Sequence, residues 1–115
     1  MKFSVLVAIL ADEMEDKAID IARDAGAGAI SIINARGLSG DAKKTFFGLT
    51  YEGAQSVLLL VLERHLSLQI LKKITRELDL ENDNRGIAFT MPLEHLGGVN
   101  QRDIIEFSKN LEDEI

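Results

Sequence analysis

The chain has 115 residues, the usual size of one domain, and its 46% apolar and 28% charged residues are ordinary for a globular protein. It contains no cysteine, which excludes disulfides, thiolate metal sites and cysteine nucleophiles. Its net charge of -6 argues against a protein whose main task is to bind nucleic acid, because neutralising phosphates requires clustered Lys and Arg.

The amino terminus carries no recognisable targeting signal. Met1-Lys2 leads into a short apolar run without a small-residue cleavage site. The apolar runs of this chain are much shorter than the ~20 residues that a membrane-spanning helix needs. We therefore expect a cytoplasmic protein without membrane insertion, folded as one domain over residues 1–115.

The first elements are a predicted strand and a predicted helix. Phe3 to Leu10 is a continuous run of branched apolar residues, which favours a buried strand. Asp12 resembles a helix N-cap, and Glu15 three residues later completes a capping-box pattern. Apolar residues at helical spacing follow, and Gly26 stands where a glycine would end the helix.

Two further strands surround a polar segment. Ala29 to Ala35 predicts the second strand, and a glycine-bearing polar segment runs from Arg36 to Thr45. Phe46 to Tyr51 has the pattern of a short extended piece that Gly53 breaks. Ser56 to Glu63 is the strongest strand pattern in the chain.

The last third of the chain predicts helix, strand and helix. Ser67 is the expected cap of a second helix, with an apolar side made of Leu68, Ile70, Leu71, Ile74 and Leu78. Ile87 to Leu93 reads as a strand, and Pro92 suggests an edge position. Gln101 to Glu112 predicts a short C-terminal helix. The resulting fold class is α+β, a ferredoxin-like βαββαβ arrangement with a C-terminal helix.

The predicted sheet is apolar on both faces. In the first strand Val5, Val7 and Ile9 alternate with residues that are also apolar, and the third strand repeats this pattern. A ferredoxin-like sheet has helices on one face only, so the other face should be polar in a monomer. Each exposed Leu or Val forgoes about 1.5–3 kcal/mol of burial. We expect a homo-oligomer, and cover by the C-terminal helix is the alternative.

Two strings, together with the order of elements, resemble the nitrogen-regulatory PII family. Residues 32–40, Ile-Ile-Asn-Ala-Arg-Gly-Leu-Ser-Gly, resemble the end of that family's second strand and the start of its signalling T-loop. Residues 87–94, Ile-Ala-Phe-Thr-Met-Pro-Leu-Glu, resemble its last long strand. The resemblance covers residues 2–98. It implies a homotrimer that binds ATP or ADP in clefts between subunits, signals to protein partners through loops, and is not an enzyme.

The departures from the family predict a divergent member. The 37–54 loop is shorter than a PII T-loop, although it remains the expected contact for a protein partner. Residues 81–86, Glu-Asn-Asp-Asn-Arg-Gly, replace the family's glycine- and lysine-rich phosphate loop, and acidic side chains repel phosphates. The resemblance therefore implies a small ligand, either an adenine nucleotide (ATP, ADP or AMP) or a small anion.

The most site-like segment follows the second predicted strand. Its glycines would let backbone N–H groups approach an anion, and its cations would supply charge. The candidate ligand-binding residues here are Arg36, Gly37, Ser39, Gly40, Lys43 and Lys44. A solvated connecting loop is the alternative.

A second candidate group stands at strand ends. Arg64 and His65 are expected to end the third strand, and Arg85 and Gly86 precede the fourth. In a ferredoxin-like oligomer such ends can approach a neighbouring subunit's cleft, where a divergent nucleotide pocket could use them. Ordinary surface charges are the alternative.

Two other functions stay open. One is a structural or partner-binding trimer without a ligand site. The other is a divalent-cation-binding ferredoxin-like trimer, although His65 and His95 are 30 residues apart and lack metal-ligand spacing. His95 beside Glu94 is interpreted as an ordinary polar pair. No G-x-S-x-G string supports hydrolase chemistry.

Overall fold

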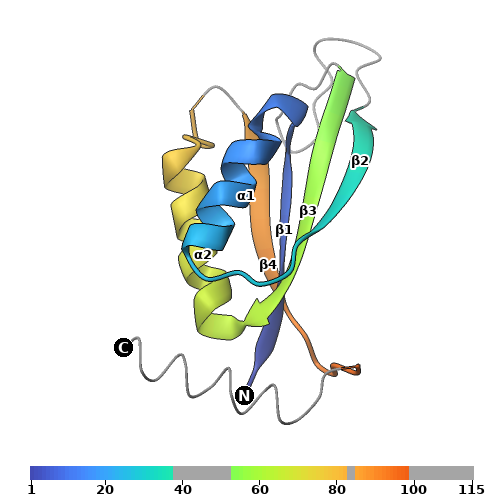
Figure 1. The fold of residues 1–115 in the computed structure, drawn as a ribbon, viewed down its shortest axis with the longest axis vertical. Helices are drawn as coiled ribbons and strands as arrows, with labels where there is room; N and C mark the ends of the chain where they lie inside the picture. Colours follow the sequence, from blue (N-terminus) through green and yellow to red (C-terminus); the bar gives the residue numbers. More distant parts are fainter. Residues whose placement is uncertain (38–52, 83–84, 99–115) are drawn as a thin grey trace.

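The computed structural model describes residues 1–37, 53–82 and 85–98. The chain forms a four-stranded sheet of order β2-β3-β1-β4 with two helices on one of its faces (Figure 1). In chain order the elements are β1 (Phe3–Ala11), a 3-10 turn (Asp12–Met14), α1 (Glu15–Asp24), β2 (Ser31–Gly37), β3 (Gly53–Glu63), α2 (Arg64–Glu77) and β4 (Gly86–Pro92). This order and sheet topology confirm the predicted ferredoxin-like α+β class.

All strand pairs are antiparallel, and their register defines two ends of the sheet. Gly37 pairs with Gly53, Ala11 with Gln55 and Leu10 with Gly86, so we call this the loop end. At the opposite end Phe3 pairs with Glu63, and Ser4 pairs with Pro92. Gly53 is the first residue of β3, and the extended piece that it was predicted to break lies outside the described residues.

The core lies between the sheet and the helices. One side-chain row of β1 and one row of β3 face α1 and α2, and both rows are fully or almost fully buried. The largest buried side chains are Leu6, Leu10, Leu58, Leu60, Ile70 and Ile74. Burying a Leu or Ile side chain contributes about 1.5–3 kcal/mol, so this layer is the main source of stability.

Neither helix begins where the sequence predicted. Asp12 and Glu15 do not form a capping box, because α1 starts after a 3-10 turn and has no side-chain cap. Both carboxylates instead lie beside the Ser56 hydroxyl of β3, with Oγ–O distances of 2.8 Å and 2.7 Å. The predicted local contact is thus replaced by a long-range one.

Ser67 does not cap α2 either. The N-cap is Glu63, whose carboxylate accepts hydrogen bonds from the backbone N–H groups of His65 (2.9 Å) and Leu66 (3.2 Å). Arg64 and His65 therefore form the first turn of α2, and the prediction that they end the third strand was wrong. The buried side of α2 runs through Leu66, Ser67, Ile70 and Ile74, and Leu68 is 46% exposed.

Both helices end in the same hydrogen-bond motif. At α1, Gly26 N–H donates to the Arg23 carbonyl and Ala27 N–H to the Ala22 carbonyl, which is a Schellman motif with a left-handed glycine at φ 113°. This confirms Gly26 as the end of the helix. At α2 the corresponding left-handed residue is Asp79, at φ 54°.

The predicted extended piece at Phe46 to Tyr51 and the predicted helix at Gln101 to Glu112 lie outside the described residues. Pro92 ends β4, and β4 pairs only with β1, so its predicted edge position is confirmed. Across residues 1–37, 53–82 and 85–98, neither helix has the length and apolarity to cross a membrane.

Replacing Asp79 by glycine should stabilise the protein. Glycine adopts positive φ without the steric cost that a β-carbon adds, so we expect the free energy of unfolding in urea to rise by about 0.5–1 kcal/mol. Asn82→Ala is the control, because it removes only the 2.7 Å hydrogen bond from Asn82 to Asp79. An Asp79→Gly variant no more stable than wild type would contradict the interpretation that the helix end is strained.

Candidate functional site

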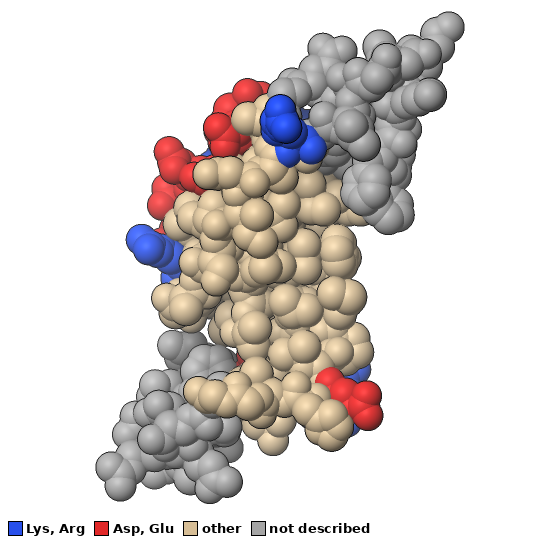
Figure 2. All heavy atoms as spheres, turned by 90° about the vertical axis from the view of Figure 1, so that its right-hand side faces the viewer, with Lys and Arg blue, Asp and Glu red and all other residues tan. Residues whose placement is uncertain are grey.

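The face of the sheet opposite the helices, here called the outer face, is apolar on all four strands. The register places its side chains in adjoining rows, such as Met91–Val5–Val61 and Phe89–Val7–Leu59. Figure 2 shows the side of the molecule that carries β2 and β3, where charged residues lie at the rim and other residues fill the middle. The apolar residues of the outer face are Ile33, Val57, Leu59, Val61, Val5, Val7, Ile9, Ile87, Phe89 and Met91.

This outer face is not covered by the described helices. Val61 is 50% exposed, and Ile33 and Met91 are each 48% exposed. The prediction of a sheet that is apolar on both faces is therefore confirmed. Soluble monomers rarely expose a contiguous apolar surface of this kind, and such surfaces mark interaction sites.

The loop end of the sheet separates two of the predicted ligand-binding groups. Arg36 and Gly37 end β2, whereas Arg85 and Gly86 stand at the start of β4, and these are the two edge strands. Three strand spacings of ~4.8 Å put the two pairs about 14 Å apart within one chain. The predicted residues Ser39, Gly40, Lys43 and Lys44 lie outside the described residues.

Arg85 and Gly86 also have packing roles. Arg85 Nη1 donates to the Leu78 carbonyl at the end of α2, over 3.4 Å. A cation is favourable there because the helix dipole is negative at its C-terminus. A β-carbon on Gly86 would lie 2.8 Å from the Ile9 carbonyl oxygen, so the close approach of β4 to β1 requires glycine. Packing within one chain thus explains why an arginine stands at position 85 and a glycine at position 86, without a ligand.

Negative charge gathers at the same end of the sheet. Asp12 and Glu15 lie beside the fully buried Ser56, whose single hydroxyl proton can be donated to only one of them at a time. Among the described residues, Arg36 and Arg85 are the predicted site cations at the loop end, where these carboxylates would repel an anion.

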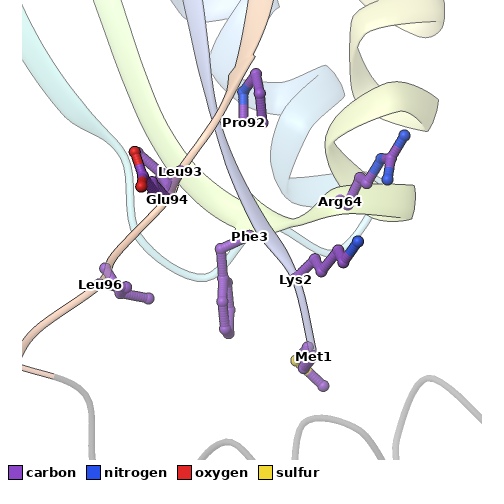
Figure 3. A pocket seen from close by; sticks show the side chains of 8 residues that line it. All are labelled: Met1, Lys2, Phe3, Arg64, Pro92, Leu93, Glu94 and Leu96. Carbon is purple, nitrogen blue, oxygen red and sulfur yellow. The ribbon is translucent and has the colours of Figure 1, made fainter.

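The opposite end of the sheet contains a depression of about 520 Å³. Arg64 lines it, so this predicted site residue lies far from Arg36 and Arg85. Figure 3 shows Arg64 and Lys2 on the α2 side, Glu94 on the other side, and Phe3 between them. The lining residues are Met1, Lys2, Phe3, Arg64, Pro92, Leu93, Glu94 and Leu96.

Sequence analysis did not identify Lys2, Phe3, Leu93 or Leu96 as site residues. They come from two segments far apart along the chain, and no local motif joins them. The β1–β4 register brings them together, with the Leu93 N–H donating to the Phe3 carbonyl over 3.0 Å. A correct prediction of that antiparallel pairing would have placed them side by side.

Among the described residues, neither histidine gathers with other metal ligands. His95 Nε2 lies 3.8 Å from Glu94 Oε1, and both side chains are more than nine-tenths exposed, as expected for an ordinary polar pair. In the part of the chain that the structure describes, His, Asp and Glu side chains nowhere gather in threes suited to holding a metal ion.

Solved structures similar to this fold include PII-like proteins. A PII-like protein from Thermus thermophilus has a TM-score of 0.61 and 17% identity, over 81% of this chain and 88% of that one. CPII from Thiomonas intermedia K12, bound to ADP, AMP and acetate, has a TM-score of 0.62 and 16% identity, over 80% and 86%. A DUF3240 family protein from Shewanella baltica OS155 has a TM-score of 0.62 and 16% identity, over 87% and 99%.

No protein-family model matches the chain, and no curated protein matches it. The chain therefore has the PII-like fold, and the low identities agree with a divergent sequence. This confirms at the level of fold the resemblance read from residues 32–40 and 87–94.

Glu63 holds the start of α2, and with it Arg64, at the depression. Glu63→Ala removes the carboxylate that accepts two backbone N–H groups, so we expect the free energy of unfolding to fall by about 1 kcal/mol. Urea denaturation measures this. Glu77→Ala, at the exposed end of the same helix, should change it by less than about 0.5 kcal/mol. Equal effects of the two variants would disprove the capping role.

Proposed function

We propose that this chain is the subunit of a PII-like trimeric regulator that senses a small ligand, an adenine nucleotide or a small anion. It signals to a protein partner through the 37–54 loop. The observation that carries the proposal is the outer face, which is apolar on every strand and lacks a described cover. A ring of three copies would bury three such faces against each other.

The energetics favour assembly. Val61, Ile33 and Met91 are about half exposed, so burying the rest of each contributes about half of the ~1.5–3 kcal/mol of a full burial, and several contribute at once.

The ligand site we propose lies between copies. Arg36 and Gly37 are on one edge strand, and Arg85 and Gly86 are on the other, about 14 Å away. One small ligand reaches both pairs when the β2 edge of one copy adjoins the β4 edge of the next. CPII structures that hold ADP, AMP and bicarbonate support a nucleotide or a small anion as the ligand.

We further propose that the protein is cytoplasmic and is not an enzyme. A trimer that has lost its ligand site and only binds a partner is the second candidate, because Arg85 and Gly86 have packing roles of their own. A divalent-cation-binding trimer is the third, and it would need ligands from several copies or from residues outside the described ranges.

A charge on the outer face should prevent assembly. Val61→Glu places a carboxylate on the proposed interface, where burying an unpaired charge is too costly. We expect its mass by light scattering to fall to that of the monomer. Leu68→Glu is the matched control, because Leu68 is similarly exposed, at 46% against 50%, but lies on α2. The proposed interface is wrong if both variants keep the wild-type mass, or if wild type is monomeric.

Ligand binding should be detectable by thermal shift and by complementation. ADP, AMP or bicarbonate should raise the melting temperature of wild type, because a ligand that binds only the native state stabilises it. Arg36→Ala and Arg85→Ala should each abolish the shift. Mixed oligomers of the two variants should recover part of it, since some interfaces then pair Arg36 of one copy with Arg85 of another.

The controls separate binding from folding. Urea denaturation of each variant shows whether the loss of Arg85, which also contacts the Leu78 carbonyl, unfolds the protein. No shift with any of the three ligands would contradict the ligand site and leave the trimer without one and the cation-binding trimer. A shift that survives in either single variant would place the site elsewhere.

A further inference from the structure

We propose that the depression at the opposite end of the sheet is a second ligand site, for an organic anion with an apolar body and a carboxylate or phosphate head. Its volume of about 520 Å³ lies within the range of about 300–1,000 Å³ that small-molecule sites occupy. It is separated from the loop end by the length of the strands, so it is distinct from the inter-subunit site proposed above.

The lining of the depression is amphipathic. Phe3, Leu93 and Leu96 offer apolar surface, and Lys2 and Arg64 offer charge on the α2 side (Figure 3). Ligand sites commonly combine an apolar lining with a few polar groups that fix orientation. The arrangement suits a molecule that is apolar along most of its length and negative at one end.

The two cations are available to a ligand. Neither Lys2 nor Arg64 forms an ion pair within residues 1–37, 53–82 and 85–98. The lining carboxylate, Glu94, is 92% exposed and lies beside His95, on the far side of Phe3 from the cations. An Arg guanidinium can bind a carboxylate or phosphate through two parallel hydrogen bonds, and a Lys ammonium adds a point charge.

Backbone hydrogen bonds hold the cationic wall in place. The Arg64 N–H donates to the Lys2 carbonyl over 2.9 Å, so the start of α2 is tied to the start of β1. The Leu93 N–H donates to the Phe3 carbonyl over 3.0 Å, which ties the apolar wall to the same strand. The charged and apolar walls are therefore fixed relative to each other before a ligand binds.

The anion has to be bound by side chains and not by the helix N-terminus. The backbone N–H groups of His65 and Leu66, in the first turn of α2, already donate to the Glu63 carboxylate. This leaves the side chains of Arg64 and Lys2, beside the Met1 amino group, to provide the positive charge.

Octanoate and octyl phosphate are the probes, and calorimetric titration of the full chain is the measurement. Both should bind, whereas acetate, inorganic phosphate and neutral octanol should each bind at least about tenfold more weakly, because they lack the chain or the charge. The relative affinities of octanoate and octyl phosphate identify the head group.

Charge-removing variants assign the site. Arg64→Gln and Lys2→Gln should each weaken octanoate binding about tenfold. Lys72→Gln should not, because Lys72 is an exposed cation two turns further along α2.

Methyl NMR signals of Leu93 and Leu96 should shift when octanoate is added, and those of Val61 and Val5 should not. The proposal is overturned by undetectable binding, by equal binding of the variants, or by shifts confined to the outer face. The thermal-shift measurements with ADP, AMP and bicarbonate are independent of these titrations, so a negative result in one experiment contradicts only the proposal that it tests.

Discussion

The sheet has two apolar faces and a single layer of helices, and most of what can be said about this protein depends on that imbalance. On the helix side Leu6, Leu10 and their neighbours are buried within one chain. On the outer face Val61 and Met91 remain about half exposed. Burial on that side requires another surface, so the proposed assembly would belong to the same energetic balance that folds the chain.

The strand order determines which residues assembly would bring together. β2 and β4 are the edges of the sheet; Arg36 lies near the end of β2 and Arg85 directly precedes β4, both at the loop end. In a single copy their backbones are about 14 Å apart, whereas neighbouring edges in an oligomer would bring them together. Ligand binding and assembly would then be linked, as a regulator whose loop reports on its ligand requires.

The two ends of the sheet differ in chemistry. The loop end combines Arg36 and Arg85 with the carboxylates that surround Ser56, so its charges are mixed. The opposite end places Arg64 and Lys2 beside apolar side chains in one depression. The first suits a polar ligand held between copies, and the second suits an amphipathic anion held within one copy. The two proposed sites together would let one small domain respond to two kinds of molecule.

The sequence by itself determined the fold class and the two-faced sheet, because strands are recognised from branched apolar runs such as Phe3 to Leu10 and helices from apolar spacing. It also located the helix end at Gly26, where only local backbone geometry matters. Tertiary structure decided the rest. Asp12 and Glu15 contact Ser56 of β3 and do not cap α1. Glu63 caps α2, so this helix begins before Ser67. Antiparallel pairing of β1 and β4 places Lys2 and Leu93 in the same depression. These contacts bridge strands or distant segments, and a local pattern alone does not fix which residues of two strands stand opposite each other.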